Sequence, residues 1–517
     1  MALWLQFTNE GFIKTSLLFA SIFIVLIIHL FLSKNKHNKI KKLNLPPGPK
    51  KLPIVGNLHQ LGNMPHISLY RLSRKYGPIL FLQLGEIPTV VVSSAKLAKE
   101  ALKTHDLVLS SRPQLYSAKY LFYGCTDIAF SPHGAYWRNI RKVCVLELLS
   151  AKRVQSFGYV REEEVARLVR RIGESYPQPT NLSKMIGLYA NDVLCRAALG
   201  RDFSGGGEYD RNDFEKMLND YQDLLGGFSL GDYFPSMEFV HSLTGMKSKL
   251  INTFRRFDRF FDSVIAEHSN SEGKTEEKKD LVDVLLDIQK NGSSSSDLPI
   301  TMDNVKAVIL DMFAAGTDTT FIILDWAMTE LMMNPRVMEK AQKEVRSIVG
   351  VRTVVQESDL HQLQYMKVVI KEVFRLHPPV PVLVPRESLE DVVIDGYDIP
   401  ARTRIYINGW AIARDQEIWE NPEIFEPERF MDSTIDYKGQ DFEFIPFGAG
   451  RRICPGIAFG SAVVELALAQ LLHSFDWELP AGVKATDIDN TEAFGISVHR
   501  TVHLHGIAKP HFPLSRK

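Results

Sequence analysis

The sequence is poor in cysteine and carries no excess charge of either sign. Its 517 residues include four widely separated cysteines, whereas a disulfide framework uses more of them, at closer spacing, in a smaller secreted chain. Lys plus Arg and Asp plus Glu both number 61. The chain therefore has no net positive charge that would indicate nucleic-acid binding, and a charged partner would have to bind a local patch of charge. We find no internal repeat, and no glycine-rich fingerprint follows a predicted strand, so we do not expect the chain to bind a dinucleotide itself.

One long hydrophobic run is present, from Leu17 to Leu32. It approaches the ~20 apolar residues that a helix needs to cross a bilayer. A cleaved signal peptide is the alternative, but its basic residues come before the apolar run. Here they follow it, as Lys34, Lys36, Lys39, Lys41 and Lys42. Because positive residues stay on the cytosolic side, we predict an uncleaved, single-pass anchor with the body of the protein in the cytosol.

A proline-rich stretch, LPPGPKKLPIVGN, follows the lysines. Proline fixes φ and restrains the residue before it, so this stretch is predicted to be a stiff strut, with a plain linker as the alternative. We therefore divide the chain into an anchor (1–33), a basic and proline-rich hinge (34–57) and a catalytic domain (58–517). In that domain ILFLQLG and PTVVVSS predict a β-hairpin. Most later patterns are helical, so the expected fold class is mostly α with a smaller β region (α+β).

The most informative stretch is PFGAGRRICPG, which contains Cys454. Its glycines allow tight turns and a close approach of backbone to a flat ligand. An apolar helix pattern follows, so Cys454 lies just before a helix N-terminus, where the dipole and free N–H groups stabilise a thiolate. Zinc is not favoured, because no second Cys or His lies at ligand spacing nearby. A catalytic thiol would need a His base, and no family signature supplies one.

This stretch resembles the haem-binding signature of the cytochrome P450 family, Phe-x-x-Gly-x-Arg-x-Cys-x-Gly. Every defined position matches, at Phe447, Gly450, Arg452, Cys454 and Gly456. The resemblance implies haem b with the Cys454 thiolate as axial iron ligand, Phe447 beside the sulfur and Arg452 paired with a haem propionate. A thiolate ligand donates electron density to iron and favours O–O cleavage, which is the chemistry of a monooxygenase.

The resemblance covers nearly the whole chain. It is strongest to microsomal plant enzymes of specialised metabolism, through LPPGPKKLPIVGN, AGTDTT, FxPERF and PFGAGRRICPG together. It implies the fold of that family, with the haem between a long oxygen-handling helix and the helix that follows the cysteine. It also implies a location at the endoplasmic reticulum membrane.

The oxygen-handling helix is predicted from Asp303 to Met333. Its middle, AAGTDTT, is weak helix sequence, and a threonine hydroxyl there can return to a carbonyl of the preceding turn. Small Ala315 and Gly316 would leave room over a haem for dioxygen. The segment resembles the family's Ala/Gly-Gly-x-Asp/Glu-Thr-Thr/Ser motif, which implies that Thr319 hydrogen-bonds oxygen at the iron and that Asp318 helps to relay protons. The alternative is a helix kink with surface polar residues.

Three charged residues are assigned to the frame of the fold. Glu372 and Arg375 are three apart on one helical face, where they can pair. By themselves they would suggest an exposed surface pair. In the family such a pair is buried and completed by an arginine from a later loop, for which FEPERF supplies Arg429. We interpret all three as structural.

Further propionate contacts are implied for Trp137 and Arg141, four apart in AYWRNIRKV, and for Arg386 of VPRES. For any single arginine a solvated surface charge is the alternative.

Segments that line the substrate pocket in the family are mostly apolar here, which implies a lipophilic substrate such as a terpenoid, an indole-type alkaloid or a phenylpropanoid. The candidate wall residues are Leu121, Phe122, Tyr123, Phe228, Phe234, Phe313, Val380, Val382, Leu383, Phe494 and Ile496. Asp311 lies one turn before Ala315. It could pair with the cation of an amine substrate, or it could turn aside and bond a neighbouring backbone or polar group.

Electrons must come from a partner, and the resemblance implies a membrane-bound NADPH–cytochrome P450 reductase, with a cytochrome b-type donor as a further candidate. The basic residues that could contact it near the cysteine loop are Arg138, Lys142, Lys152, Arg153 and Arg451. Two other functions are kept as alternatives. An oxygen-independent isomerase or dehydratase of the same family generally lacks the acid–alcohol pair that is present here. A membrane-tethered haem sensor leaves that pair and the apolar pocket unexplained.

Overall fold

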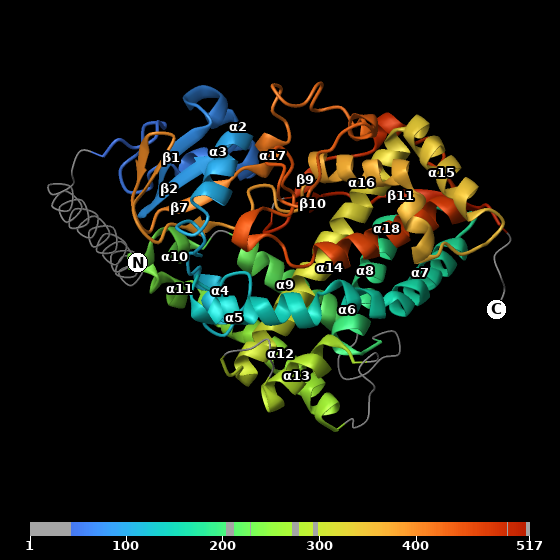
Figure 1. Ribbon diagram of the computed structural model, residues 1–517, viewed down its shortest axis with the longest axis horizontal. Coiled ribbons are helices and arrows are strands. Elements are labelled where there is room, and N and C mark those ends of the chain that lie inside the picture. The colour runs from blue at the N-terminus through green and yellow to red at the C-terminus, as the bar shows by residue number, and fades with distance from the viewer. Residues whose placement is uncertain are drawn as a thin grey trace, which may run out of the picture.

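The computed structural model describes residues 43–202, 211–227, 229–270, 279–292, 298–493 and 495–512, without the side chains of 211–215 and 270. The predicted anchor and the first part of the hinge lie outside these residues, as do Phe228 and Phe494. The fold has a small sheet at one end and a large helical part at the other (Figure 1).

Helices dominate the described chain, as predicted. They are α2 (Pro65–Tyr76), α3 (Ala95–Lys99), α4 (Tyr116–Leu121), α5 (Ala135–Val143), α6 (Ala151–Ser156), α7 (Gly158–Gly173), α8 (Leu182–Leu199), α9 (Arg211–Gly226), α10 (Leu230–Tyr233), α11 (Val240–Leu243), α12 (Met246–Asn270), α13 (Leu281–Asn291), α14 (Met302–Met333), α15 (Pro335–Val349), α16 (Gln364–Leu376), α17 (Gly409–Ile412) and α18 (Ile457–Ser474).

The strands form small sheets. The largest has the order β1-β2-β7-β4, and the others are β3-β11-β8, β5-β6 and β10-β9. The predicted hairpin is present, because β1 pairs antiparallel with β2 in the register Leu84↔Ile87. The strands are β1 (Ile79–Leu84), β2 (Ile87–Val92), β3 (Thr180–Asn181), β4 (Arg386–Glu387), β5 (Val392–Ile394), β6 (Tyr397–Ile399), β7 (Arg404–Ile407), β8 (Phe475–Glu478), β9 (Glu492–Ala493), β10 (His499–Arg500) and β11 (His505–Pro510).

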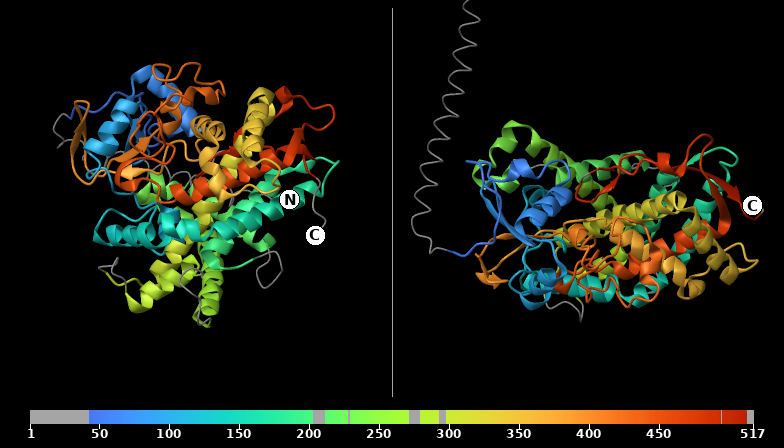
Figure 2. Two further views of the ribbon diagram at one scale, coloured as in Figure 1. Left: turned by 45° about the vertical axis from the view of Figure 1, so that its right-hand side comes forward. Right: turned by 90° about the horizontal axis from the view of Figure 1, so that it is seen from above.

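Helix α14 is the axis of the helical part, and it packs against α8, α16 and α18. Its start is fixed by a capping box between Thr301 and Asn304, and it ends at Met333, where Asn334 is the C-cap before the proline that opens α15. The helix is apolar on most of its circumference, as expected of a helix surrounded by others. Two described helices, α14 and α18, are long and apolar enough to cross a membrane, but both are mostly buried in the fold. Seen from above in Figure 2, the yellow α14 runs through the helical part with other helices on both sides.

Candidate active site

The cysteine loop joins a short helix, η9 (Gly450–Arg452), to the start of α18. Gly450 adopts φ +69°, and a Cβ there would lie 2.3 Å from the carbonyl oxygen of Leu102, so only glycine fits. The N–H of Cys454 donates to the carbonyl of Phe447 at 3.0 Å. The N–H of Gly456 points at the cysteine Sγ, at 3.4 Å. The loop therefore holds the thiol in a fixed direction at the foot of α18.

Burial raises the pKa of the Cys454 thiol, while the Gly456 N–H and the charge of Arg141 act in the opposite direction. A bound metal ion deprotonates such a thiol outright. Arg141 also ties α5 to the loop, because its Nη2 donates to the carbonyl of Ile453 at 2.5 Å. Phe447 packs edge-on against Phe374, with ring centroids 4.9 Å apart.

Buried arginines gather beside this loop. Arg452 donates to the carbonyls of Ser110 (2.8 Å) and Ser131 (2.7 Å), and its guanidinium lies 3.8 Å from the ring centroid of Trp137. Arg386 donates to Asp106 Oδ1 (2.9 Å) and to the carbonyl of Ala449 (2.8 Å).

Arg112 is the fourth arginine of this group, after Arg452, Arg386 and Arg141, and no local sequence pattern indicated it. Its Nε donates to the carbonyl of Ala129 (2.9 Å) and its Nη1 to that of Val384 (2.6 Å). Burial and the neighbouring arginines lower the pKa of Arg112, and they lower that of Arg452 to about 9.

The charges in this group do not balance. Among the described residues, the acids that offset these four arginines are Asp106 and Asp127. Uncompensated buried cations are costly, and a group that carries two carboxylates would neutralise them. Haem is such a group, so the described residues fit it: a single thiol on one side and an excess of buried positive charge beside it.

In the middle of the oxygen-handling helix, α14, one residue is exposed among buried neighbours. Ala315 is exposed although Phe313, Ala314 and Thr317 around it are buried. The hydroxyl of Thr319 donates to the carbonyl of Ala315 at 2.7 Å, which is the predicted return to the preceding turn.

Gly316 lies where α14 packs on α8. A Cβ on Gly316 would lie 2.9 Å from the side chain of Leu194 of α8, so its small size allows the two helices to pack closely. Consecutive helical residues point about 100° apart, so Ala315 and Gly316 have different neighbours, and room for oxygen at Gly316 stays a prediction.

The carboxyl of Asp318 is held by groups from other elements. The hydroxyl of Ser497, in the turn between β9 and β10, donates to its Oδ2. Burial raises the pKa of Asp318, against opposing contributions from Ser497, His499 and Gln222 of α9. Sequence reasoning missed Ser497, because nothing local marks it as a partner of a residue on α14.

The frame residues meet as a buried triad. Glu372 and Arg375 are fully buried and joined by two hydrogen bonds, of 2.7 and 2.8 Å. Arg429 Nε donates to Glu372 Oε1 at 3.0 Å. Arg375 also donates to the carbonyls of Ala413 and Pro422, so the triad fastens α16 to the segment that leads to the cysteine loop.

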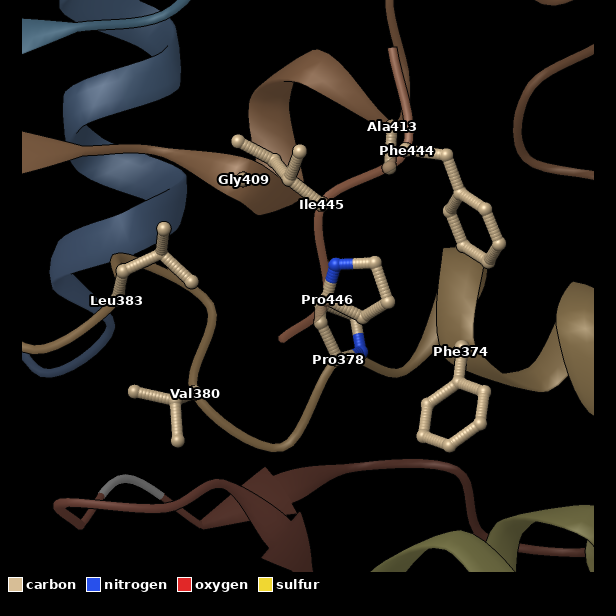
Figure 3. A pocket seen from close by; sticks show the side chains of 9 residues that line it. All are labelled: Phe374, Pro378, Val380, Leu383, Gly409, Ala413, Phe444, Ile445 and Pro446. Atoms are coloured by element: carbon tan, nitrogen blue, oxygen red, sulfur yellow. The ribbon is translucent and has the colours of Figure 1, made fainter. Parts of the chain in front are cut away.

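The predicted wall residues lie in three parts of the described structure, and their role at a substrate pocket stays a prediction. Val380 and Leu383 line a hollow of about 10 Å³ beside the cysteine loop, together with Phe374 and Pro446 (Figure 3). Val382 packs against the β1–β2 cluster. The ring of Phe234 lies against Gly85 in the β1–β2 turn.

The other described wall residues are buried in the main core. Leu121, Phe122 and Phe313 are at most 1% exposed, and Ile496 is partly buried against the same core. Tyr123 donates from its hydroxyl to Asp258 of α12 at 2.8 Å.

Asp311 takes the second of the two expected arrangements. It is 8% exposed, and its Oδ2 accepts the N–H of Ile128 at 2.5 Å. The carboxyl is therefore engaged with the loop before α5.

A second hollow, of about 360 Å³, opens at α5. It is lined by the basic residues Arg138, Arg141, Lys142 and Arg451, with Trp137, Val145 and Leu146. Of the other predicted contacts, Lys152 is exposed, whereas Arg153 donates to the carbonyls of Glu147 and Lys279.

Comparisons with known proteins agree with this geometry. The family model "Cytochrome P450" matches residues 46–504. "Cytochrome P450 71AP13" of Prunus mume is 69% identical over 498 residues, covering 96% of each chain. "Strychnine-11-hydroxylase" of Strychnos nux-vomica is 47% identical over 497 residues, covering 96% of this chain and 97% of its own. A zebra fish cytochrome P450 solved with abiraterone superposes with a TM-score of 0.75 at 26% identity, over 87% of this chain and 100% of that one. The chain thus belongs to the cytochrome P450 family of haem-thiolate monooxygenases, among its plant members.

Proposed function

We propose that this enzyme hydroxylates or otherwise oxidises a small lipophilic plant-type metabolite, such as a terpenoid, an indole-type alkaloid or a phenylpropanoid. In this reaction one atom of O2 enters the substrate and the other leaves as water. Two electrons come from NADPH through a separate reductase. The observation that carries the proposal is a single directed thiol, Cys454, next to three buried arginines and the half-buried Arg141, which among the described residues are offset by Asp106 and Asp127.

The residues that would hold the haem follow from that arrangement. Cys454 would ligate the iron, and Phe447 and Gly456 would shield and orient its sulfur. Arg452, Arg386, Arg141 and Arg112 would bind the propionates, and Trp137 lies against the guanidinium of Arg452. When bound, haem supplies the redox chemistry that cleaves the O–O bond.

Proton delivery is assigned to Asp318 and Thr319. Water formation consumes two protons, so the site needs a donor near Ala315. The Thr319 hydroxyl is close enough, since it already bonds the Ala315 carbonyl. Asp318 is its neighbour, and burial raises the pKa of this carboxyl. A raised pKa keeps a larger fraction of it protonated near neutral pH, as a general acid requires.

Thr319→Ala should uncouple NADPH oxidation from product formation. A positioned proton donor contributes about 10²- to 10⁴-fold, so we expect product per NADPH to fall about tenfold or more, with the lost electrons recovered as hydrogen peroxide. Thr319→Ser, which keeps the hydroxyl, should retain most of the coupling. Thr329→Val is the matched control, because Thr329 makes the same bond to the carbonyl four residues earlier. Unchanged coupling in Thr319→Ala would remove Thr319 from the mechanism.

The hollow at α5 is the proposed binding site for the reductase. Arg138, Lys142 and Arg451 surround the exposed apolar side chains of Val145 and Leu146 there. A basic rim around an apolar centre suits an acidic protein partner. The hollow also borders Arg141, which touches the cysteine loop, so an electron donor bound there would be close to Cys454.

The membrane topology is proposed as a single anchor in the endoplasmic reticulum membrane with the body in the cytosol. Protease added to intact microsomes should then digest the body and spare the anchor. Asn181 lies in a sequon, and its side chain accepts the N–H of Lys184 at 2.9 Å as a helix cap. We expect no glycan on Asn181 or Asn291. A glycan on either residue would mean that the body faces the lumen, opposite to the proposed orientation.

The substrate class is tested by screening lipophilic metabolites against microsomes that contain this chain, its reductase and NADPH. The strychnine hydroxylase among its relatives supports including alkaloids. Oxidised product that requires O2, NADPH and reductase together supports the proposal. Conversion without O2 or reductase would favour the isomerase or dehydratase alternative.

A further inference from the structure

The loop between α4 and α5 is held on its carbonyl side by the groups assigned to the propionates. The carbonyl of Ile128 accepts from Trp137 Nε1 (3.1 Å) and Arg452 Nη1 (3.2 Å). The next carbonyl, of Ala129, accepts from Arg112 Nε at 2.9 Å. The position of this loop therefore sets where those cations point.

On its N–H side the same loop is held by two carboxyls. The N–H of Ile128 donates to Asp311 Oδ2 at 2.5 Å, and the N–H of Phe130 donates to Asp127 Oδ2 at 2.8 Å. Asp311 comes from α14 and Asp127 from the loop itself. Ile128 thus connects an acid of the oxygen-handling helix, through its N–H, to the guanidinium of Arg452, through its carbonyl.

The two carboxyls contact each other in the interior. Asp127 is fully buried and Asp311 is 8% exposed. They are within hydrogen-bonding contact, and Asp127 Oδ1 is buried with no N–H or O–H partner among the described donors. Two carboxylates cannot make such a bond, because both only accept, whereas one protonated and one ionised carboxyl can.

The electrostatics place the proton on Asp311. Burial, followed by the charge of Asp127, raises the pKa of Asp311 well above its ordinary value. Burial raises the pKa of Asp127 less, to about 6, because backbone N–H groups and Arg452 stabilise its anion.

The other titratable groups that face the pair are Arg452, Arg112, Cys125, Tyr136, Cys144 and Tyr221. Burial raises the pKa of both tyrosines and both thiols among them. They are therefore neutral near pH 7, and the two arginines are the remaining charges.

We propose that Asp127 and Asp311 share one proton, carried by Asp311, and that this pair positions the α4–α5 loop, and with it the arginines of the propionate site, against the oxygen-handling helix. Asp311 is then a positioning residue rather than a partner for a substrate cation. The proposal does not depend on which compound is oxidised.

Amide substitution tests the shared proton directly. In Asp311→Asn the amide oxygen accepts from Ile128 and the NH2 donates to Asp127, as the protonated acid does. In Asp127→Asn the oxygen accepts from Phe130 and the NH2 donates to an ionised Asp311. In the double variant both oxygens are used by the backbone, so two NH2 groups face each other without an acceptor.

The expected result is therefore strongly non-additive. Each single variant should fold and load haem like wild type, whereas the double variant should lose haem occupancy and melt lower by more than the two single shifts together. A double variant that does not fold beside two folded singles is the extreme of the same result. Asp303→Asn, at the exposed start of α14, is the control and should change nothing. Additive shifts, or an Asp311→Asn protein that misfolds, would overturn the proposal.

Two readouts separate a shared proton from simple packing. Infrared difference spectra at pH 7 should show a protonated carboxylic acid band above amide I in wild type that is lost in Asp311→Asn. The native state also holds a proton on Asp311 that the unfolded chain releases above its ordinary pKa. Wild-type stability should therefore fall as pH rises above the ordinary pKa of an aspartate carboxyl, about 4, and Asp311→Asn should lessen that fall. If the infrared band is unchanged in Asp311→Asn, or if the stability of the two proteins depends on pH in the same way, the shared proton is contradicted.

Discussion

Cys454→Ala is expected to abolish thiolate-ligated haem in this protein. The cysteine loop offers one sulfur, directed by the Gly456 N–H and the Phe447 carbonyl, and alanine leaves iron without that ligand. Removing an outer partner of a metal ligand costs about 10- to 100-fold in affinity, so loss of the ligand itself should cost more. The measurement is haem content of purified protein together with the reduced carbon monoxide spectrum.

The wild-type carbon monoxide complex should show the red-shifted Soret band of thiolate ligation, and Cys454→Ala should lack it. Cys144→Ala provides the control, since Cys144 is a buried thiol on the turn that follows α5 and has no proposed role at the iron. A Cys454→Ala protein that kept the red-shifted band would refute the ligand assignment.

Glu372→Ala should produce the largest loss of stability among the frame residues. It removes the one carboxylate that Arg375 and Arg429 share and strands two buried guanidinium groups. Removing one member of a buried ion pair costs about 3–5 kcal/mol. Because the triad fastens α16 to the segment before the cysteine loop, haem occupancy should fall as well.

Denaturant unfolding followed by circular dichroism measures this loss. The matched control is Glu426→Ala. The Glu426 side chain is 48% exposed, and its carboxylate lies 3.4 Å from Arg429 Nη2. An exposed pair contributes about 0–1 kcal/mol, so the control should unfold nearly as wild type does. Equal unfolding of the two variants would mean that the triad adds nothing beyond a surface pair.

The sequence predicted those elements whose signals are local. The long, mostly apolar helix pattern from Asp303 to Met333 predicted α14, and the β-branched runs around the turn at Gly85 predicted β1 and β2. The cysteine loop could be identified because its glycines and Cys454 are adjacent in the chain. The membrane anchor falls outside the described residues and remains a proposal.

The contacts that sequence reasoning missed are long-range. Ser497 meets Asp318 across 179 residues, and Arg112 reaches the carbonyl of Val384 across 272. No local pattern marks a serine or an arginine for such a partner. The contact of Gly316 with Leu194 of α8 is likewise visible only in the packed structure.

Transfer of oxygen from O2 tests the central claim most directly. A compound that is turned over by microsomes containing this chain, reductase and NADPH would be incubated under ¹⁸O2 in ordinary water, and the product analysed by mass spectrometry. For hydroxylation, we predict one ¹⁸O atom per product molecule in wild type and loss of that product in Cys454→Ala. A hydroxylated product without ¹⁸O, or one formed equally in the absence of O2, would contradict the assignment as a monooxygenase.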